Sequence, residues 1–84
     1  MEQIARNAKQ IAAAVRRRRR ELGLSQKDLG GKIKLRQATL SRLETGEPAM
    51  RLQTLLDVLS ALNLEIIIRP RTKASASDIE EMFS

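Results

Sequence analysis

Apolar residues recur along the first two thirds of the chain at the three- and four-residue spacing of amphipathic helices. The first stripe contains Ile11, Val15 and Leu22 and predicts a helix from about Asn7 to Leu22. Asn7 is a suitable N-cap because its side-chain oxygen can accept a backbone N–H of the first turn. Gly23 marks the end, where glycine takes up the left-handed conformation without steric cost.

A second helix is predicted from about Gln26 to Lys32. Ser25 followed three residues later by Asp28 is the pattern of a capping box, in which each side chain accepts the other residue's backbone N–H. Gly30 and Gly31 lie inside this helix, where each costs about 1 kcal/mol relative to alanine. A glycine in this place indicates that another helix crosses close by.

Two further helices are predicted after the second. The third helix is predicted from about Gln37 to Thr45 with Gly46 as its stop, and the fourth from about Leu52 to Leu62. The stripe of the fourth helix is the strongest amphipathic signal in the chain. It consists of Leu52, Leu55, Leu56, Leu59 and Leu62.

The segment 64–69 is short, rich in isoleucine and ended by Pro70, so we predict a β-strand. Leu64, Ile66 and Ile68 share one face, and Ile67 lies on the other. No second strand is predicted, and one strand alone leaves its backbone donors and acceptors unpaired. We therefore expect the same strand of a second copy to pair with it, antiparallel, in a homodimer. In the alternative, the segment packs as a loop over the fourth helix of a monomer.

Composition narrows the classes of function. The 84 residues are enough for one domain, and the formal net charge is +6. Residues 1–51 carry 13 basic and 5 acidic side chains, whereas residues 52–84 carry 3 and 5, so an anionic partner is expected at the first part. Histidine and cysteine are absent, and carboxylates are not clustered, which argues against an enzyme, a metal site or a cofactor. We expect no signal peptide and no membrane span, hence a cytoplasmic, nucleoid-associated protein.

Two short helices joined by a tight turn after a basic helix form a helix-turn-helix. The sequence Leu-Ser-Gln-Lys-Asp-Leu at 24–29 and Gln-Ala-Thr-Leu-Ser-Arg-Leu-Glu-Thr-Gly at 37–46 closely resembles the Xre/Cro-repressor type of this motif. The resemblance covers residues 11–62. It implies a compact, mainly α, four-helix domain that binds double-stranded DNA, and the predicted dimer implies a palindromic operator.

The resemblance also implies contact residues. Gln26, with Lys27 beside it, would face a DNA phosphate at the start of the second helix, where the helix end carries partial positive charge. The third helix would lie in the major groove, with Thr39 supporting it or bonding a phosphate. The side chains expected at base edges are Arg36, Gln37, Ala38, Ser41 and Arg42. Arg36 or Arg42 would bind guanine, Gln37 adenine and Ala38 a thymine methyl group.

In this family the glutamate that here is Glu44 pairs with an arginine late in the first helix, here Arg19, so we assign the pair a structural role. The rest of the run Arg16–Arg20 is either a solvated helix face or supplies a few phosphate contacts. The chain departs from the family at Lys34, where glycine often closes the turn, at Gly30, where alanine is usual, and at Arg18, where an apolar residue is common. We expect mild backbone strain at Lys34 and tolerance at Gly30. The stem of Arg18 would lie over the edge of the core.

The sequence therefore predicts three parts: a helix-turn-helix domain over 1–63, a dimerising strand over 64–70 and a flexible tail over 71–84. The strand over 64–69, the Pro-Arg that follows it and the acidic-apolar tail resemble the HipB group of antitoxins. In the group the protein represses its own operon and binds a HipA-type kinase toxin. The tail has a short amphipathic end formed by Ile79, Met82 and Phe83. This end either docks on a partner or is a frayed terminus.

Three functions are therefore compatible with the sequence. The leading hypothesis is a repressor and antitoxin of a HipBA-like type II module. A stand-alone or phage-type regulator would share its DNA binding but have no toxin. A protein-interaction module that has lost DNA binding is the third, and the basic third helix argues against it.

Overall fold

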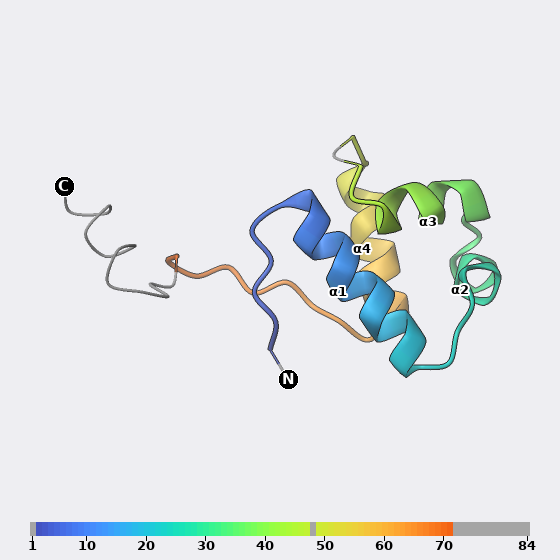
Figure 1. Ribbon diagram of the computed structural model, residues 1–84, viewed down its shortest axis with the longest axis horizontal. Coiled ribbons are helices and arrows are strands. Elements are labelled where there is room, and N and C mark those ends of the chain that lie inside the picture. The colour runs from blue at the N-terminus through green and yellow to red at the C-terminus, as the bar shows by residue number, and fades with distance from the viewer. Residues whose placement is uncertain (1, 48, 72–84) are drawn as a thin grey trace.

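The computed structural model describes residues 2–47 and 49–71. Within these ranges the chain forms four helices, and Figure 1 shows α1 crossing in front of α4, with α2 and α3 beside them. The helices are α1 (Ala8–Glu21), α2 (Gln26–Ile33), α3 (Gln37–Glu44) and α4 (Leu52–Ala61). The predicted mainly α, four-helix fold is confirmed. Ile79, Met82 and Phe83 lie outside the described residues.

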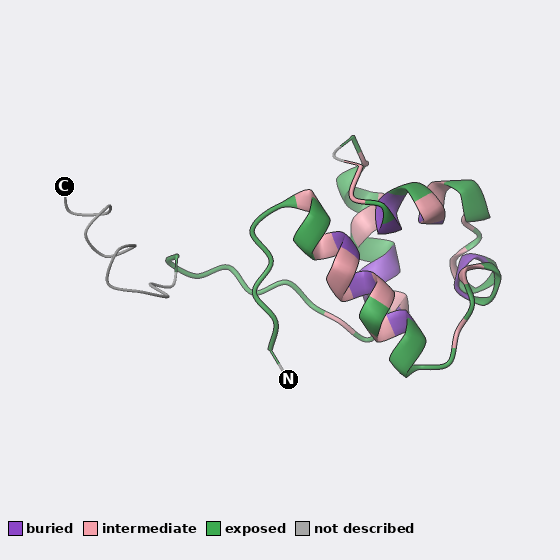
Figure 2. Ribbon diagram, viewed as in Figure 1, coloured by how far each residue is buried: buried purple, intermediate pink, exposed green. Residues whose placement is uncertain are grey.

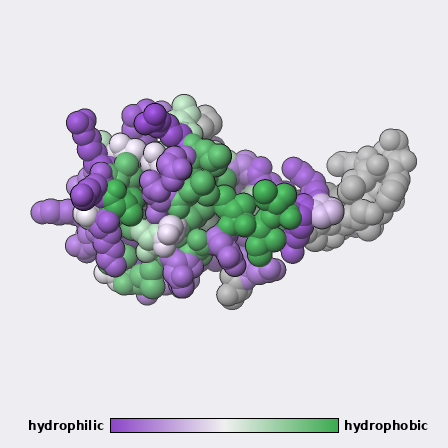
Figure 3. Space-filling view, turned by 180° about the vertical axis from the view of Figure 1, so that it is seen from behind, coloured by the Kyte–Doolittle hydropathy of each residue, from purple (hydrophilic) through white to green (hydrophobic). Residues whose placement is uncertain are grey.

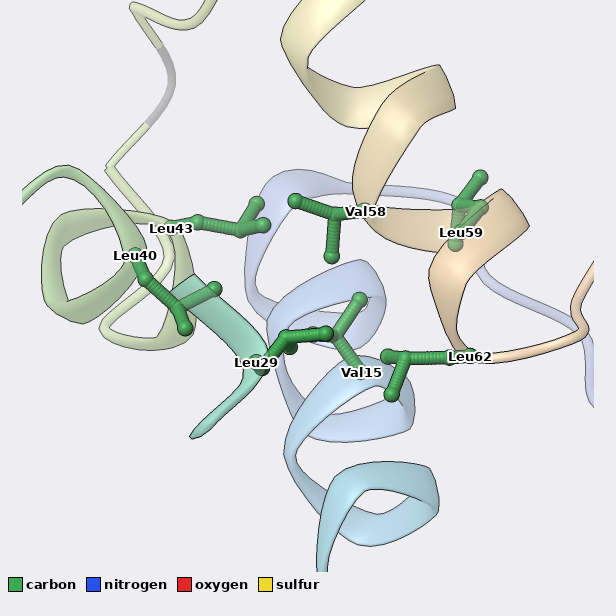
Figure 4. Packing of buried hydrophobic residues seen from close by; sticks show 7 residues of the cluster. All are labelled: Val15, Leu29, Leu40, Leu43, Val58, Leu59 and Leu62. Atoms are coloured by element: carbon green, nitrogen blue, oxygen red, sulfur yellow. The ribbon is translucent and has the colours of Figure 1, made fainter. Parts of the chain in front are cut away.

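The core is built from aliphatic side chains of all four helices. Figure 4 shows Val15 of α1 and Leu29 of α2 at its centre, with Val58 and Leu62 covering them from α4 and the residue that follows it. Leu40, from α3, closes the other side and is fully buried. A fully buried aliphatic side chain contributes about 2 kcal/mol, so these few residues supply most of the driving force for folding. Figure 2 shows that the outer faces of the helices are exposed.

Local capping explains where α1 and α2 begin. The Asn7 side chain accepts the backbone N–H of Gln10 at 2.9 Å, as its N-cap role requires. At α2 the predicted capping box is complete: the Ser25 hydroxyl accepts the Asp28 N–H, and the Asp28 carboxylate accepts the Ser25 N–H, both at 3.0 Å. These contacts satisfy backbone donors that a helix start otherwise leaves unpaired.

The capping box makes part of the stability pH-dependent. The pKa of Asp28 is lowered from its ordinary value near 3.8, chiefly because the backbone N–H of Ser25 donates to its carboxylate. A lowered folded-state pKa stabilises the protein above about pH 4 and ceases to do so as the pH falls further. We therefore expect Asp28→Asn to lower the melting temperature at pH 7 and to make progressively less difference below pH 4. Thermal unfolding followed by circular dichroism at pH 7, 4 and 3 measures this, and a constant difference at all three values would contradict it.

The structure corrects three positions assigned to the apolar stripes. Leu22 is 43% exposed, Leu52 is 67% exposed and Leu56 is 39% exposed. In α4 the buried side chains are instead Val58 and Leu59. The leucines of α4 occupy two adjacent stripes, and only one of them faces the core.

The turn between α2 and α3 explains Gly30. A Cβ atom at Gly30 would lie 2.6 Å from the carbonyl oxygen of Leu35, whose own N–H donates to the Gly30 carbonyl at 2.8 Å. The prediction of a crossing helix is therefore wrong, because the close neighbour is the backbone of the turn. Glycine in place of the family's usual alanine leaves room for this close approach. Lys34 closes the turn in the left-handed conformation (φ 54°), as expected, at a cost of about 1 kcal/mol.

Beyond α4 the described chain continues as residues 62–71. Asn63 has a left-handed backbone (φ 56°) that ends the helix, and the Leu64 N–H donates to Leu59 at 2.8 Å. Residues 64–69 form neither helix nor sheet within the described chain. Figure 1 shows this segment running away from the helices past the N-terminal residues, where Arg69 and Glu2 form an ion pair at 3.8 Å. Pairing of a strand with a second copy stays a prediction.

Candidate nucleic-acid interface

The exposed face of α3 carries polar and basic side chains. Gln37, Ala38 and Arg42 are exposed, and Arg36 is exposed at the N-cap position. Ala38 and Arg42 are four residues apart, so their side chains lie on the same face of the helix. No side chain caps α3, and this leaves backbone donors of its first turn available to an outside partner.

Two other predicted contact residues of α3 are less accessible. Thr39 and Ser41 are half-buried, next to the fully buried Leu40. Their hydroxyl groups lie at the border between the core and the exposed face. Half burial is compatible with both roles expected for Thr39, support of the helix or a phosphate bond, and the base contact expected of Ser41 stays a prediction.

A basic hollow extends along one face of α2, from Lys27 past the turn at Lys34 to the start of α3. It has a volume of about 400 Å³, and its lining includes the side chains of Lys27, Lys34, Arg36 and Gln37. Gly30 and Gly31 contribute backbone to its floor. Three basic residues around one open hollow suit an anionic group such as a phosphate. Sequence reasoning considered Lys34 only for its backbone strain. A basic residue in the turn between the two motif helices was the signal that could have identified it.

A buried ion pair holds α1 and α3 together. The Arg19 guanidinium binds the Glu44 carboxylate through two parallel hydrogen bonds, Nε to Oε2 at 2.7 Å and Nη2 to Oε1 at 2.9 Å. The Arg19 side chain is 10% exposed and that of Glu44 3%. Donation to the Glu44 carboxylate raises the pKa of Arg19. The third donor, Nη1, binds the Leu24 carbonyl at 2.8 Å, so the same arginine also orients the loop before α2.

Gln26 belongs to this network. Its side-chain amide donates to Glu44 Oε1 at 3.3 Å and is half-buried. The expected phosphate contact of Gln26 would therefore come from the remaining amide proton or from the backbone N–H. The glutamate at the end of α3 thus fixes α1, α2 and α3 relative to one another, which sets the angle at which α3 is presented.

The arginine run of α1 divides between structural and exposed residues. Arg16 donates to the Glu44 backbone carbonyl at 2.9 Å, and Arg18 donates to the Leu62 carbonyl at 3.0 Å. Both are half-buried. Arg17 and Arg20 are exposed. Arg16 and Arg18 each donate to a backbone carbonyl that has no partner within its own helix end or turn.

The exposed face of α3 also holds an ion pair between Arg42 and Glu47. Arg42 Nε donates to Glu47 Oε2 at 2.8 Å, and Nη2 donates to Oε1 at 3.1 Å. Through these bonds Arg42 lowers the pKa of Glu47, so the carboxylate stays ionised at neutral pH. Glu47 follows α3 directly and was not among the residues singled out from the sequence.

Within residues 2–47 and 49–71, no group of three or more acidic side chains is placed to hold a metal ion. In the same ranges no helix has both the length and the apolar character needed to cross a bilayer.

Comparison with known proteins agrees with this geometry. A helix-turn-helix family model matches residues 15–68. Among solved structures, the matching chain of a HipB-O4 20mer complex has 28% sequence identity to this chain and a TM-score of 0.79. The match covers 84% of this chain and 100% of that chain. A HipA-HipB-O2-O3 complex is 28% identical with a TM-score of 0.78 and the same coverage. No curated protein sequence is significantly similar. The resemblances found in the sequence are confirmed, and the chain belongs to the helix-turn-helix family.

Proposed function

We propose that this chain is a dimeric, sequence-specific DNA-binding repressor and the antitoxin of a HipBA-like type II module. The observation that carries the DNA-binding part is the exposed face of α3 beside the basic hollow. Buried contacts of Arg19, Glu44 and Gln26 hold that face at a fixed angle. A preset angle matters because a recognition helix must enter the major groove without rearranging the domain.

The exposed residues divide into two kinds of contact. Arg36, Gln37, Ala38 and Arg42 stand where base edges would lie, and Arg36 or Arg42 would read guanine through two parallel hydrogen bonds. Lys27 and Lys34 line the hollow and would bind phosphates, which position the protein but do not read the sequence. The division separates the exposed residues of α3 and its N-cap from the lysines that line the hollow.

A dimer is favoured by the apolar surface at the back of the domain. Figure 3 shows hydrophobic side chains continuing from the middle of the molecule along the chain that follows α4. In α4 and the segment after it the exposed large apolar side chains are Leu52, Leu56, Ile66, Ile67 and Ile68, and a groove of about 410 Å³ runs between α4 and residues 64–66. Ile68 alone is 94% exposed. Contiguous exposed apolar surface marks an interface, and antiparallel pairing of two 64–69 segments would cover this one.

Two copies would place two recognition helices in successive major grooves about 34 Å apart, on an inverted repeat. The antitoxin part of the proposal rests on similarity to HipB, which is found in a complex with HipA. We propose a HipA-like kinase as the partner of this chain, in a cytoplasmic, nucleoid-associated complex that adjusts repression to the amount of toxin.

The first test is a mobility-shift measurement with the DNA just upstream of the gene, at two salt concentrations and against scrambled competitor. We expect tight binding that weakens steeply with salt, because phosphate contacts release counterions, and that survives the competitor. Binding no stronger than to scrambled DNA would contradict the repressor function.

Titration of the complex with a kinase-like protein encoded in the same operon tests whether the chain binds a toxin. Absence of an interaction would leave a repressor that is not an antitoxin.

Two single variants separate base reading from phosphate binding. Arg42→Ala should weaken binding to the upstream DNA about tenfold and leave scrambled DNA almost unaffected, because a base contact is lost. Lys27→Ala should weaken binding to both and reduce the salt slope by about one. Fluorescence anisotropy with both duplexes measures the two effects. An equal loss on both duplexes with Arg42→Ala would make Arg42 a phosphate contact.

A further inference from the structure

Glu47 is held beside Arg42 by backbone as well as by side-chain contacts. After α3 ends, the Arg42 carbonyl accepts the Glu47 N–H at 3.3 Å and the Thr45 hydroxyl at 2.9 Å. Gly46 makes the reversal possible with φ 83°, and its Cα faces Lys9 of α1 so closely that a Cβ atom would lie 3.0 Å from the Lys9 side chain. The position of Glu47 is therefore fixed by the turn, which distinguishes this pair from a chance contact of two mobile surface side chains.

The geometry of the pair leaves one edge of Arg42 open. A guanidinium has five N–H donors, arranged as a side edge of Nε and one terminal nitrogen and an end edge of the two terminal nitrogens. Glu47 takes the side edge, through Nε and Nη2. With the side edge occupied, the end edge still offers two parallel donors, which can bind O6 and N7 of a guanine. The Arg42 side chain remains 63% exposed, so this edge is accessible.

The charge of Glu47 has a second consequence. An unpaired arginine on the recognition helix attracts any phosphate within reach, whatever the sequence. A carboxylate 2.8 Å from Nε neutralises that attraction and repels phosphate oxygens. It does not weaken a hydrogen bond to a base in the same way, since a guanine edge carries no net charge.

We propose that Glu47 is a specificity-determining positioning residue, which holds the side edge of Arg42 so that its end edge is presented to a guanine and not to phosphates. The inference rests on the proposed DNA binding and adds to it the residue that orients the reading arginine. Arg42 touches the DNA, and Glu47 acts through it.

The test compares Glu47→Gln with a matched control, Glu21→Gln. Both variants remove one carboxylate charge that is paired with an arginine, since Glu21 is 55% exposed and lies 3.6 Å from Arg18. Only Glu47 is next to the recognition helix. Affinities for the upstream DNA and for a scrambled duplex are measured by fluorescence anisotropy at several salt concentrations, with circular dichroism to verify that each variant is folded.

We expect Glu47→Gln to bind scrambled DNA about threefold more tightly, with a salt slope steeper by up to about one, because the freed arginine gains a phosphate contact. Preference for the upstream DNA should fall about tenfold. Glu21→Gln should leave that preference unchanged. If Glu47→Gln changes both affinities by the same factor, or if the control loses preference equally, the inference is overturned.

A base-level measurement makes the distinction sharper. Each guanine of the upstream site is replaced in turn by 7-deazaguanine, which lacks the N7 acceptor. The wild-type chain should lose affinity at the guanine read by Arg42, and Glu47→Gln should be much less sensitive at that same position. Equal sensitivity of both proteins at every guanine contradicts the inference. A wild-type chain that prefers neither duplex contradicts the proposed function itself, whereas a preference that Glu47→Gln retains contradicts only the role of Glu47.

Discussion

Replacement of Glu44 by alanine is expected to lower the melting temperature by about 15 °C, a loss of about 3 kcal/mol in the free energy of unfolding. The reason is the nearly buried Arg19 guanidinium, which would keep its charge but lose both hydrogen bonds to the carboxylate. Gln26 would lose its contact as well. A domain of this size has a total stability of roughly 4–12 kcal/mol, so this single change removes a large share. Thermal unfolding followed by circular dichroism measures the loss.

Glu47→Ala is the matched control for this prediction. It removes a carboxylate with the same two-bond geometry to an arginine, but in this pair the arginine side chain is 63% exposed and that of Glu47 39%. Exposed pairs contribute little to stability, because water already solvates both charges. We expect the melting temperature to change by no more than about 2 °C. Equal losses in the two variants would show that burial of the Arg19–Glu44 pair is not what makes it important.

A double variant tests whether the loss of stability comes from the charge left unpaired in the core. Arg19→Met with Glu44→Leu removes both charges, so neither is left unpaired in the core. Replacement of a buried ion pair by apolar residues is often close to neutral. The double variant should therefore recover part of the stability that Glu44→Ala loses. The Leu24 carbonyl, which Arg19 also binds, would remain without that donor and should make the recovery incomplete.

The helices and their ends follow from local signals in the sequence. Asn7, Ser25 with Asp28, and the glycines at 23 and 46 act on the backbone within a few residues, so their effect does not depend on how the helices pack. Which leucines are buried depends on packing. Leu52 and Leu59 both fit the periodicity of α4, and only contact with the other helices decides that Leu59 is inside and Leu52 outside.

The candidate interface was predictable to a similar extent. Exposure of Gln37, Ala38 and Arg42 is compatible with the motif, because the buried Leu40 and Leu43 set the opposite face of the helix. The roles of Arg16 and Arg18 could not be predicted, since each binds a carbonyl at least 28 residues away along the chain. The role of Glu47 could not be predicted either. Its partner Arg42 is near in sequence, but the contact depends on the chain reversal at Gly46.

The second large effect is expected at the proposed dimer interface. Ile67→Asp should convert the protein to a monomer and lower its affinity for the upstream DNA by about a hundredfold or more. A dimer binds its second half-site as an intramolecular event, and that advantage is lost when the copies separate. The helical core should survive, because all seven residues of the buried cluster come from one chain and Ile67 is not among them. Far-UV circular dichroism should therefore be nearly unchanged while sedimentation shows half the mass.

Two controls separate the interface from the added charge. Ile67→Val keeps a β-branched apolar side chain and should preserve both the dimer and the DNA affinity. Ala49→Asp adds the same charge in an exposed part of the loop before α4 and should also remain dimeric. If Ile67→Asp loses DNA binding but remains a dimer, residue 67 contacts the DNA and not the partner subunit. A wild-type chain that sediments as a monomer at micromolar concentration would contradict the dimer. The exposed isoleucines at 66–68 would then have to be covered by a different partner, since an apolar surface of this kind is costly to leave in water.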